Sequence, residues 1–302
     1  MQSRPTIVVC GATGRQGGAL VRALLAADRW QVIGLSRSSS GDTVRVLKEN
    51  GVTITNADLF DKQSLERAFS RAHGVFGVTQ PWSTDYKKCD TEGEVRQGKN
   101  IIDACRDASV KHLVISTVMH FDEGKTGIPH VDSKLEIEEY ADRSGIPYAL
   151  LKPASFMDNI GSSFFPVKKG KIRGFVDADA KVPYVCCRDI GEVVARLFAE
   201  VAPAIGRKIN LVSDFVAGNE LCEIISRLRN GRRFRYRAVP KLLMRLFAKE
   251  FYVMRKAFES WGRPPYRKEI LESIDFCRKQ YPFLWTVEQY LKARGVDTKE
   301  LN

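Results

Sequence analysis

A glycine-rich segment near the start of the chain has the residue types and spacing for binding phosphate groups. Residues 11–18, Gly-Ala-Thr-Gly-Arg-Gln-Gly-Gly, follow the apolar run 6–10 and lead into a stretch with helical periodicity. The GxxGxxG spacing is a variant of the dinucleotide-binding fingerprint. Gly11 would allow a tight turn, Gly14 would let the backbone approach a pyrophosphate, and Gly17 would let the helix pack against the strand. Free N–H groups at the positive end of the helix would then meet the phosphates. The predicted cofactor-binding residues of this loop are Gly11, Thr13, Gly14, Arg15, Gln16 and Gly17.

The residues after the second apolar run, 31–35, distinguish between the two nicotinamide dinucleotides. A carboxylate at this point would accept hydrogen bonds from the adenine ribose and favour NAD. The sequence has Arg37 instead, among the hydroxyls of Ser36 and residues 38–40. A guanidinium matches the geometry of a 2′-phosphate, so the sequence predicts NADP(H) in preference to NAD(H). A solvent-facing arginine in a serine-rich loop would give the same pattern.

The elements that must position these residues follow from the alternation of short β-rich runs with helical periodicity. The predicted strands of the first half are 6–10, 31–35, 52–57, 74–79, 111–117 and 147–152, and the predicted helices are 17–27, 62–72, 91–108 and 131–144. Such alternation is typical of a parallel sheet with right-handed crossovers. Several runs are apolar throughout, which fits strands buried on both faces. We therefore predict an α/β fold with a doubly wound, Rossmann-type parallel sheet over residues 1–153.

The alternation weakens after residue 153. One further crossover is predicted to add to the Rossmann domain, with strand 182–187, helix 189–201 and strand 208–213. Residues 232–237 place arginine at every odd position, which predicts a half-exposed strand. Further helices are predicted at 218–229, 241–258, 267–280 and 286–293. Residues 154–302 would thus be mixed in structure, forming mainly a smaller, mostly helical C-terminal cap on the substrate side.

Composition excludes several classes of protein. The 302 residues are 44% hydrophobic and 28% charged, an ordinary globular mixture that fits two domains. No apolar run approaches the roughly 18 residues of a membrane span, and the start does not resemble a secretory segment. We expect a soluble, cytoplasmic protein, with access to the nucleus left open and no membrane partner. The seven cysteines form no CxxC pair and the four histidines are scattered, so no metal site is expected.

The positive charge lies mainly near the end of the chain. The net charge is +12, and residues 221–302 hold 19 Lys and Arg against 9 Asp and Glu. This basicity would suit an acidic partner or nucleic acid. The aromatic residues there have the spacing of core-facing positions, however, and no nucleic-acid motif accompanies them. A solvated basic face is therefore favoured, and nucleic-acid binding is disfavoured.

An ordered set of motifs resembles the NmrA-like family of atypical short-chain dehydrogenase/reductases, and also the isoflavone-reductase group. Besides the loop and Arg37, the motifs are Ala57-Asp58-Leu59, residues 77–82, Ser116-Thr117, His130 with Lys134, residues 153–159 and residues 184–191. The resemblance implies an NADP(H)-binding Rossmann domain closed by a small C-terminal domain. It further implies that Asp58 and Leu59 border the adenine, that Thr79 and Gln80 lie along the ribose and pyrophosphate, that Lys134 reaches the nicotinamide ribose, and that Phe156 and Asn159 shape the nicotinamide end.

The candidate catalytic residues depart from the usual short-chain pattern. Such reductases place Tyr and Lys four residues apart on one helix face, where the lysine lowers the pKa of the tyrosine. Here His130 and Lys134 have that spacing, and a strand-end hydroxyl is offered by Ser116 or Thr117. One reading is an NADPH-dependent reductase of a small carbonyl, enone or quinone, with His130 or Lys134 as proton donor. The other is a non-catalytic NADPH/NADP⁺ sensor that regulates a protein partner. His130 as a helix-start residue without a chemical task is equally compatible. The sequence identifies neither substrate, partner nor oligomeric state.

Overall fold

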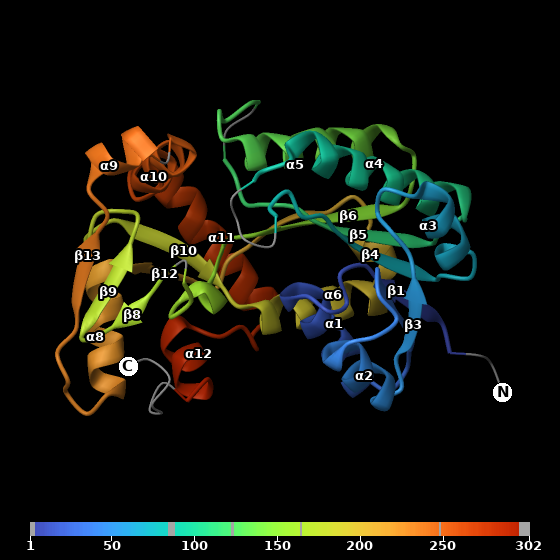
Figure 1. The fold of residues 1–302 in the computed structure, drawn as a ribbon, viewed down its shortest axis with the longest axis horizontal. Coiled ribbons are helices and arrows are strands. Elements are labelled where there is room, and N and C mark those ends of the chain that lie inside the picture. Colours follow the sequence, from blue (N-terminus) through green and yellow to red (C-terminus); the bar gives the residue numbers. More distant parts are fainter. Residues whose placement is uncertain (1–3, 84–87, 122–123, 164, 248, 296–302) are drawn as a thin grey trace. The chain divides into compact units, whose positions relative to one another are not determined.

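The computed structural model describes residues 4–83, 88–121, 124–163, 165–247 and 249–295 (Figure 1). Its contacts divide the chain into two compact units, residues 1–152 with 190–209 and residues 153–189 with 210–302.

The first unit is built on the central sheet. Its strands are β1 (Thr6–Val9), β2 (Gln31–Ser36), β3 (Thr53–Asn56), β4 (Gly74–Val78), β5 (His112–Ser116), β6 (Tyr148–Pro153) and β11 (Lys208–Leu211). They lie in the order β11-β6-β5-β4-β1-β2-β3. Neighbours from β3 to β6 pair in parallel. The order 3-2-1-4-5-6 is that of a doubly wound sheet, so the predicted α/β fold is confirmed.

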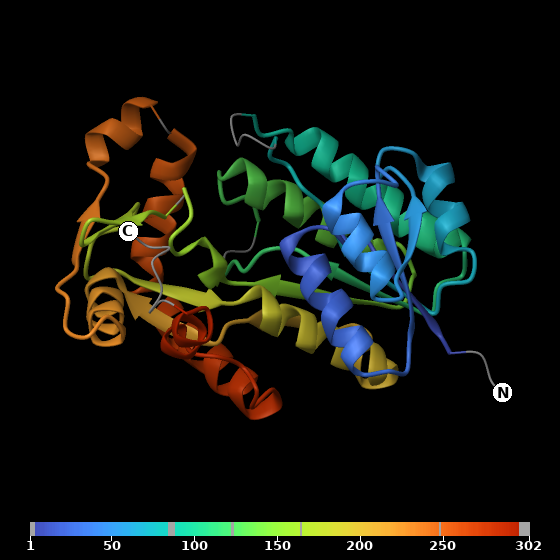
Figure 2. The same ribbon diagram turned by 60° about the horizontal axis from the view of Figure 1, so that its bottom comes forward.

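Helices cover both faces of this sheet. They are α1 (Arg15–Ala26), α2 (Asp42–Glu49), α3 (Lys62–Phe69), α4 (Thr91–Asp107), α5 (Pro129–Arg143), α6 (Cys187–Ala199) and the short α7 (Val201–Ala204). Figures 1 and 2 show α3, α4 and α5 on one face and α1, α2 and α6 on the other. The core below α3–α5 is apolar and closely packed, with Phe69, Ile101 and Leu113 all fully buried. Because parallel strands end at one edge, the loops after β1, β2, β3 and β4 meet there.

The second unit holds two small sheets. One has the order β12-β10-β7, and the other β13-β9-β8. The strands are β7 (Ser155–Phe156), β8 (Val167–Lys168), β9 (Lys171–Gly174), β10 (Lys181–Val185), β12 (Asp214–Ala217) and β13 (Arg235–Ala238). The helices are η1 (Met157–Asn159), α8 (Gly218–Leu228), α9 (Lys241–Phe247), α10 (Lys249–Trp261), α11 (Tyr266–Gln280) and α12 (Val287–Ala293). Ile172, Leu221 and Ile225 are among its buried core residues.

The structure differs from the sequence-based prediction in this second half. β10 was expected in the Rossmann sheet, but it pairs antiparallel with β12 and parallel with β7. The crossover through α6 therefore leads from one sheet to another, because periodicity identifies a strand without naming its partner. The stretch 241–258, predicted as one helix, contains α9 and the start of α10. Within the described residues, no helix has both the length and the apolar character needed to cross a bilayer.

Candidate dinucleotide-binding site

The loop after β1 has the geometry that its glycines predict. Gly11 has φ +63°, in the left-handed region that favours glycine. A Cβ on Gly17 would lie 2.2 Å from the Gly11 carbonyl oxygen, so only glycine allows the helix to start this close to the turn. The Gly14 N–H donates to that same oxygen at 2.8 Å. The loop is thus a tight turn that delivers the chain directly into α1.

The N-terminus of α1 is open to a ligand. Gly14 is its N-cap residue, no side chain caps it, and its first turn holds no acidic residue. The helix therefore presents backbone N–H groups and the positive end of its dipole. Gly11, Thr13, Gly14 and Arg15 are exposed, Gln16 is half-buried and Gly17 is buried. Below the loop, the Ser116 hydroxyl donates to Gln16 Oε1 at 2.7 Å and ties the loop to the end of β5.

Arg37 follows β2 and is exposed. A hollow of about 510 Å³ begins two residues later, lined by Ser39, Ser40, Gly41, Asp42, Val44, Arg45, Lys48 and Glu49. Lys48 Nζ reaches back over this loop and donates to the Ser39 carbonyl at 3.1 Å. Sequence reasoning missed Lys48 because α2 was not predicted. That helix has only eight residues and buries only Val44, so it offers few apolar positions from which a helix could be predicted.

The loop after β3 is held by its own hydrogen bonds. Asp58 Oδ1 accepts from the Phe60 N–H at 2.9 Å, which closes a turn. The Leu59 carbonyl accepts from Asn100 Nδ2 at 2.9 Å. Both Asp58 and Leu59 are half-buried. The structure therefore places these two residues at the ligand edge of the sheet, in a fixed backbone conformation.

The loop after β4 joins Lys134 in a buried polar network. Lys134 Nζ lies 2.7 Å from Glu94 Oε1 and donates to Thr79 Oγ1 at 2.5 Å and to the Thr79 carbonyl at 3.3 Å. The Ser133 hydroxyl donates to Glu94 Oε2 at 2.6 Å. The three N–H donors of the ammonium are thus all engaged. Contact of Lys134 with a ribose would require the exchange of one of these bonds. Gln80, next in the chain, is exposed.

Glu94 is the partner that sequence reasoning missed. Its side chain is fully buried, on the same stripe of α4 as Gly98 and Ile101. An acidic residue on the apolar face of an amphipathic helix was the available signal, because such a charge is rarely buried without a partner. The identity of that partner, 40 residues away on α5, could not be read from spacing.

His130 stands at the start of α5. It is half-buried, and its ring centroid lies 5.7 Å from that of Trp82, in the loop after β4. Lys134 is one helical turn further along. The two candidate catalytic residues therefore lie on one face of one helix, beside the loop that carries Thr79 and Gln80.

A second buried polar cluster lies at the ends of β5 and β6. The Thr117 hydroxyl donates to Glu138 Oε1 at 2.6 Å, so it is directed at α5. Lys152 Nζ lies 2.7 Å from His120 Nε2 and 3.4 Å from Glu138 Oε2. Burial acts to raise the pKa of Glu138, but the His120 hydrogen bond and the Lys152 charge hold it below its usual value. Burial lowers the pKa of Lys152. Of the two predicted hydroxyls, Ser116 faces the glycine loop after β1, and Thr117 does not.

The remaining predicted residues belong to the second unit. Phe156 lies in β7 and Asn159 in η1, and both are half-buried. Between them, Asp158 Oδ2 accepts from the Cys187 N–H at 2.9 Å at the start of α6. Among the described residues, no group of three or more His, Cys, Asp or Glu could hold a metal ion.

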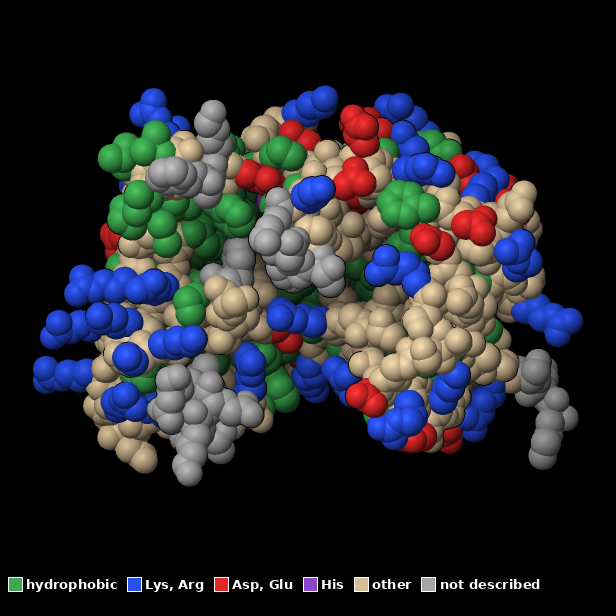
Figure 3. Space-filling model, in the orientation of Figure 1, with side chains coloured by type: hydrophobic (Ala, Val, Ile, Leu, Met, Phe, Trp, Pro, Cys, Tyr) green, Lys and Arg blue, Asp and Glu red, His purple; other side chains and the backbone are tan. Residues whose placement is uncertain are grey.

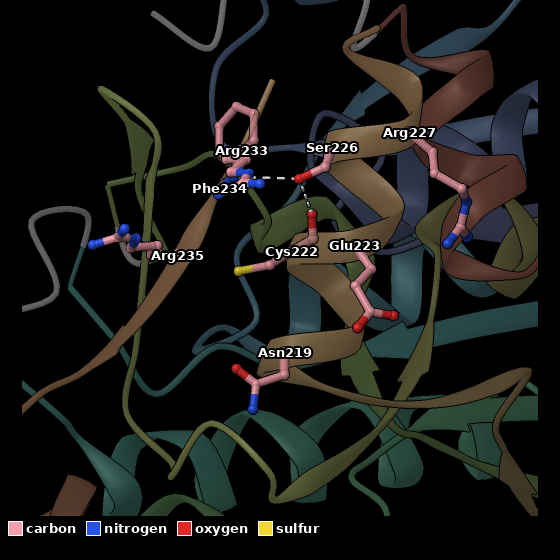
Figure 4. A pocket seen from close by; sticks show the side chains of 8 residues that line it. All are labelled: Asn219, Cys222, Glu223, Ser226, Arg227, Arg233, Phe234 and Arg235. Carbon is pink, nitrogen blue, oxygen red and sulfur yellow. Dashed lines mark hydrogen bonds between the residues drawn. The ribbon is translucent and has the colours of Figure 1, made fainter. Parts of the chain in front are cut away.

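A hollow of about 730 Å³ lies within the second unit, beside α8 and the segment that leads into β13 (Figure 4). Its lining residues are Asn219, Cys222, Glu223, Ser226, Arg227, Arg233, Phe234 and Arg235. The Ser226 hydroxyl accepts from the Phe234 N–H and donates to the Cys222 carbonyl. Burial raises the pKa of Cys222 to about 11, so its thiol stays protonated at neutral pH. Sequence reasoning interpreted Arg233, Phe234 and Arg235 as part of a half-exposed basic strand and predicted no pocket here.

Comparison with known proteins shows to which family the chain is related. A model of the NmrA-like family matches residues 3–291. The oxidoreductase FrzB of Cladobotryum sp., described as containing an NmrA-like family domain, is 29% identical over 255 residues, which cover 77% of this chain and 76% of FrzB. The crystal structure of NmrA, a negative transcriptional regulator, in complex with NAD superposes with a TM-score of 0.78 at 20% identity, over the full length of both chains. It has also been solved with NADP. Citrobacter sp. triphenylmethane reductase, complexed with NADP(H), gives a TM-score of 0.75 at 22% identity, over 95% of this chain and 99% of that one.

Proposed function

The chain belongs to the NmrA-like family, and we propose that it binds NADP(H) and reduces a small carbonyl, enone or quinone. The observation that carries the proposal is the open N-terminus of α1, reached through a glycine turn and free of any capping side chain or acidic residue. Relatives called oxidoreductases and neighbours solved with NAD or NADP support it.

The residues around the loop fit a pyrophosphate. The exposed backbone of Thr13, Gly14 and Arg15 would donate to phosphate oxygens, as helix N-termini do in general. Because Gly14 has no side chain, a phosphate group could approach the backbone closely at this position. The Ser116–Gln16 hydrogen bond would hold the first turn of α1 in place.

The residues after β2 fit a 2′-phosphate. Arg37 would supply a guanidinium fork, and Lys48, at the adjoining hollow, a second cation within reach of the same serine-rich loop. In NAD(H) the adenine ribose has a free 2′-hydroxyl, which usually donates a hydrogen bond to a carboxylate at the end of this strand. No carboxylate stands at the end of β2, so this contact would be missing here. Asp58 would border the adenine.

When bound, the nicotinamide would supply the hydride. His130 would donate a ring N–H proton to the substrate oxygen, so that hydride and proton together reduce the carbonyl to an alcohol. Lys134 would act mainly by fixing Thr79, because its donors are already engaged by Thr79 and Glu94. The family resemblance also implies a role for Phe156 and Asn159 at the nicotinamide end, and this stays a prediction.

A second candidate function is a non-catalytic sensor of the NADPH/NADP⁺ ratio that regulates a protein partner. The engagement of Lys134 by a fully buried carboxylate favours it, because a lysine held in this way cannot assist a proton donor as readily as a free one. The neighbour NmrA is a negative transcriptional regulator.

Anaerobic incubation with NADPH and a panel of quinones, enals and ketones separates the two. Loss of NADPH absorbance above a blank without protein is the result expected of the reductase. Firm binding of NADPH without turnover of any panel member would select the sensor. Failure to bind either dinucleotide would overturn both.

A further inference from the structure

Two segments of the second unit carry positive charge without any acidic residue. Residues 167–174 contain four Lys and Arg, and residues 232–246 contain six, and neither segment has an Asp or Glu. The first segment forms β8 and β9, and the second runs through β13 into α9. The proposed cofactor site uses none of these charges, and Lys241 forms ion pairs with Asp177 and Glu259.

Strand register brings five of the cations onto one face of the β13-β9-β8 sheet. Arg235 lies opposite Lys171, which lies opposite Lys168, and Arg237 lies opposite Arg173. All five are exposed, whereas Ile172, on the other face, is fully buried. None of the five has a carboxylate partner among the residues that the structure describes. Like charges directly opposite one another destabilise a sheet, so this face is suited to an anionic partner. We call these five residues the basic face.

The helix that follows β13 exposes apolar side chains. Leu242 is 66% exposed, Leu246 60%, Leu243 49%, and Val239 just before the helix 38%. Met244 is 3% exposed and contacts Arg255, so it marks the inner side of α9. Leu242 and Leu246 are two positions from Met244, about 200° around the helix, and point away from the unit. Scattered exposed apolar residues are ordinary, but three leucines and one valine within eight residues form a patch.

This apolar patch, formed by Val239, Leu242, Leu243 and Leu246, is firmly anchored. The buried Arg255 of α10 donates to the Val239 carbonyl at 2.8 Å and to Glu259 Oε1 at 2.6 Å, and it also pairs with Asp177. Lys241 binds Asp177 at 3.0 Å. Figure 3 shows Lys and Arg side chains standing out over β13, with hydrophobic side chains gathered next to them over α9 and α10. The basic face and the apolar patch thus lie next to one another on the second unit.

We propose that this surface binds the anionic face of a phospholipid bilayer, with the basic face on the lipid head groups and the leucines of α9 in the acyl boundary. Clusters of four to eight Lys or Arg bind acidic lipids, and apolar side chains beside them insert below the head groups. Nucleic acid would use the cations but leave the leucines in water. A protein partner would need a pocket for each protruding leucine, whereas a bilayer accepts them without one.

The proposal concerns binding at the membrane surface and requires no spanning helix. It departs from the sequence-based expectation of no membrane partner, which rested on the lack of a long apolar run. It is also independent of the cofactor, because none of the residues involved lies in the first unit.

Co-sedimentation of the full chain with vesicles tests this proposal. We would compare vesicles of phosphatidylcholine alone with vesicles containing about one third phosphatidylserine. Wild type should bind only the second kind. Each cation near the surface contributes about fivefold to binding, so Lys171, Arg173, Arg235 and Arg237 all changed to Gln should weaken it at least about a hundredfold. The matched control changes four exposed cations of the first unit, Arg22, Arg67, Arg71 and Lys111, to Gln and should bind nearly as wild type does.

A second variant tests the leucines separately. Leu242, Leu243 and Leu246 changed to Ser should weaken binding at least about tenfold. Because these side chains are already exposed, the thermal unfolding of the variant should match that of wild type. Leu271→Ser with Phe276→Ser, at exposed positions of α11, is the matched control.

Three results would overturn the proposal. The first is that wild type binds neither kind of vesicle. The second is that the four-cation variant weakens vesicle binding but the leucine variant does not. Binding would then be purely electrostatic, and the surface would be a site for another polyanion. Binding of the wild-type protein to a DNA duplex would reveal such a site. The third is that the leucine variant raises the KM for an apolar substrate and leaves vesicle binding unchanged, which would assign α9 to substrate binding.

Discussion

Replacing Lys134 with Met should destabilise the fold strongly. The change removes the cation that lies 2.7 Å from Glu94, a carboxylate that is fully buried on α4. A buried charge left without its partner costs about 3–5 kcal/mol of the free energy of unfolding. Stability of a whole domain is only about 5–15 kcal/mol, so the loss should be plain in thermal unfolding, with a fall of about 10 °C in Tm.

Two control variants isolate the cause. Lys134→Met combined with Glu94→Gln removes both charges, so the free energy of unfolding should return most of the way to that of wild type. Lys99 and Glu136 form an ion pair of the same 2.7 Å length on the surface. Lys99→Met should therefore cost less than about 1 kcal/mol.

The measurements are urea unfolding for stability and calorimetric titration for NADPH affinity. If Lys134 acts by fixing Thr79, the double variant should lose NADPH affinity modestly, because no direct contact is removed. Equal stability of Lys134→Met and Lys99→Met would refute the reasoning, since the burial of Glu94 would then carry no cost. A stable double variant that no longer binds NADPH would show instead that the lysine contacts the cofactor directly.

Three further outcomes are expected. Gly14 has φ −89° and ψ 178°, an extended conformation that any residue adopts, and a Cβ there would lie 3.2 Å from the Gly11 oxygen. Gly14→Val should therefore fold, but its side chain would occupy the proposed place of the pyrophosphate. Titration should show that both NADPH and NADH bind at least about a hundredfold more weakly. His130→Phe should keep NADPH affinity and lower turnover by about 10²–10⁴-fold, and unchanged turnover would remove His130 from the mechanism. Burial lowers the pKa of His112 to about 4, below the value of about 6.5 in the unfolded chain. The neutral His112 therefore contributes its full stability above pH 6.5, and about 3 kcal/mol of the free energy of unfolding is lost as the pH falls to 4. Urea unfolding of His112→Leu should lack this loss, and an unchanged pH dependence in the variant would assign the loss to another group.

The central sheet and the glycine turn between β1 and α1 were predictable from the sequence because their signals are local. An apolar strand, a glycine turn and a periodic helix follow one another within residues 6–27, and each constrains the next. The six strands from β1 to β6 begin and end within about two residues of the predicted ranges for the same reason. The role of Arg37 stays a prediction, which rests on its position directly after β2.

The features that sequence reasoning missed depend on contacts between distant residues or on very short elements. Glu94 and Lys134 are 40 positions apart, and no spacing rule relates α4 to α5. β7 and β8 have two residues each, too few to show a period of two. The partner of β10 was misplaced because the alternation that identifies a strand is the same in either sheet.

The most direct test of the proposed cofactor is a pair of titrations, NADPH and NADH, against wild type and Arg37→Ala. Only NADPH carries the 2′-phosphate, and a charge-assisted contact to it is worth about 1.5–3 kcal/mol. Wild type should therefore bind NADPH more tightly than NADH. Arg37→Ala should weaken NADPH by about 10- to 150-fold and leave NADH nearly unchanged. Equal affinity of wild type for the two dinucleotides, or binding of neither, would contradict the assignment of NADP(H) to this protein.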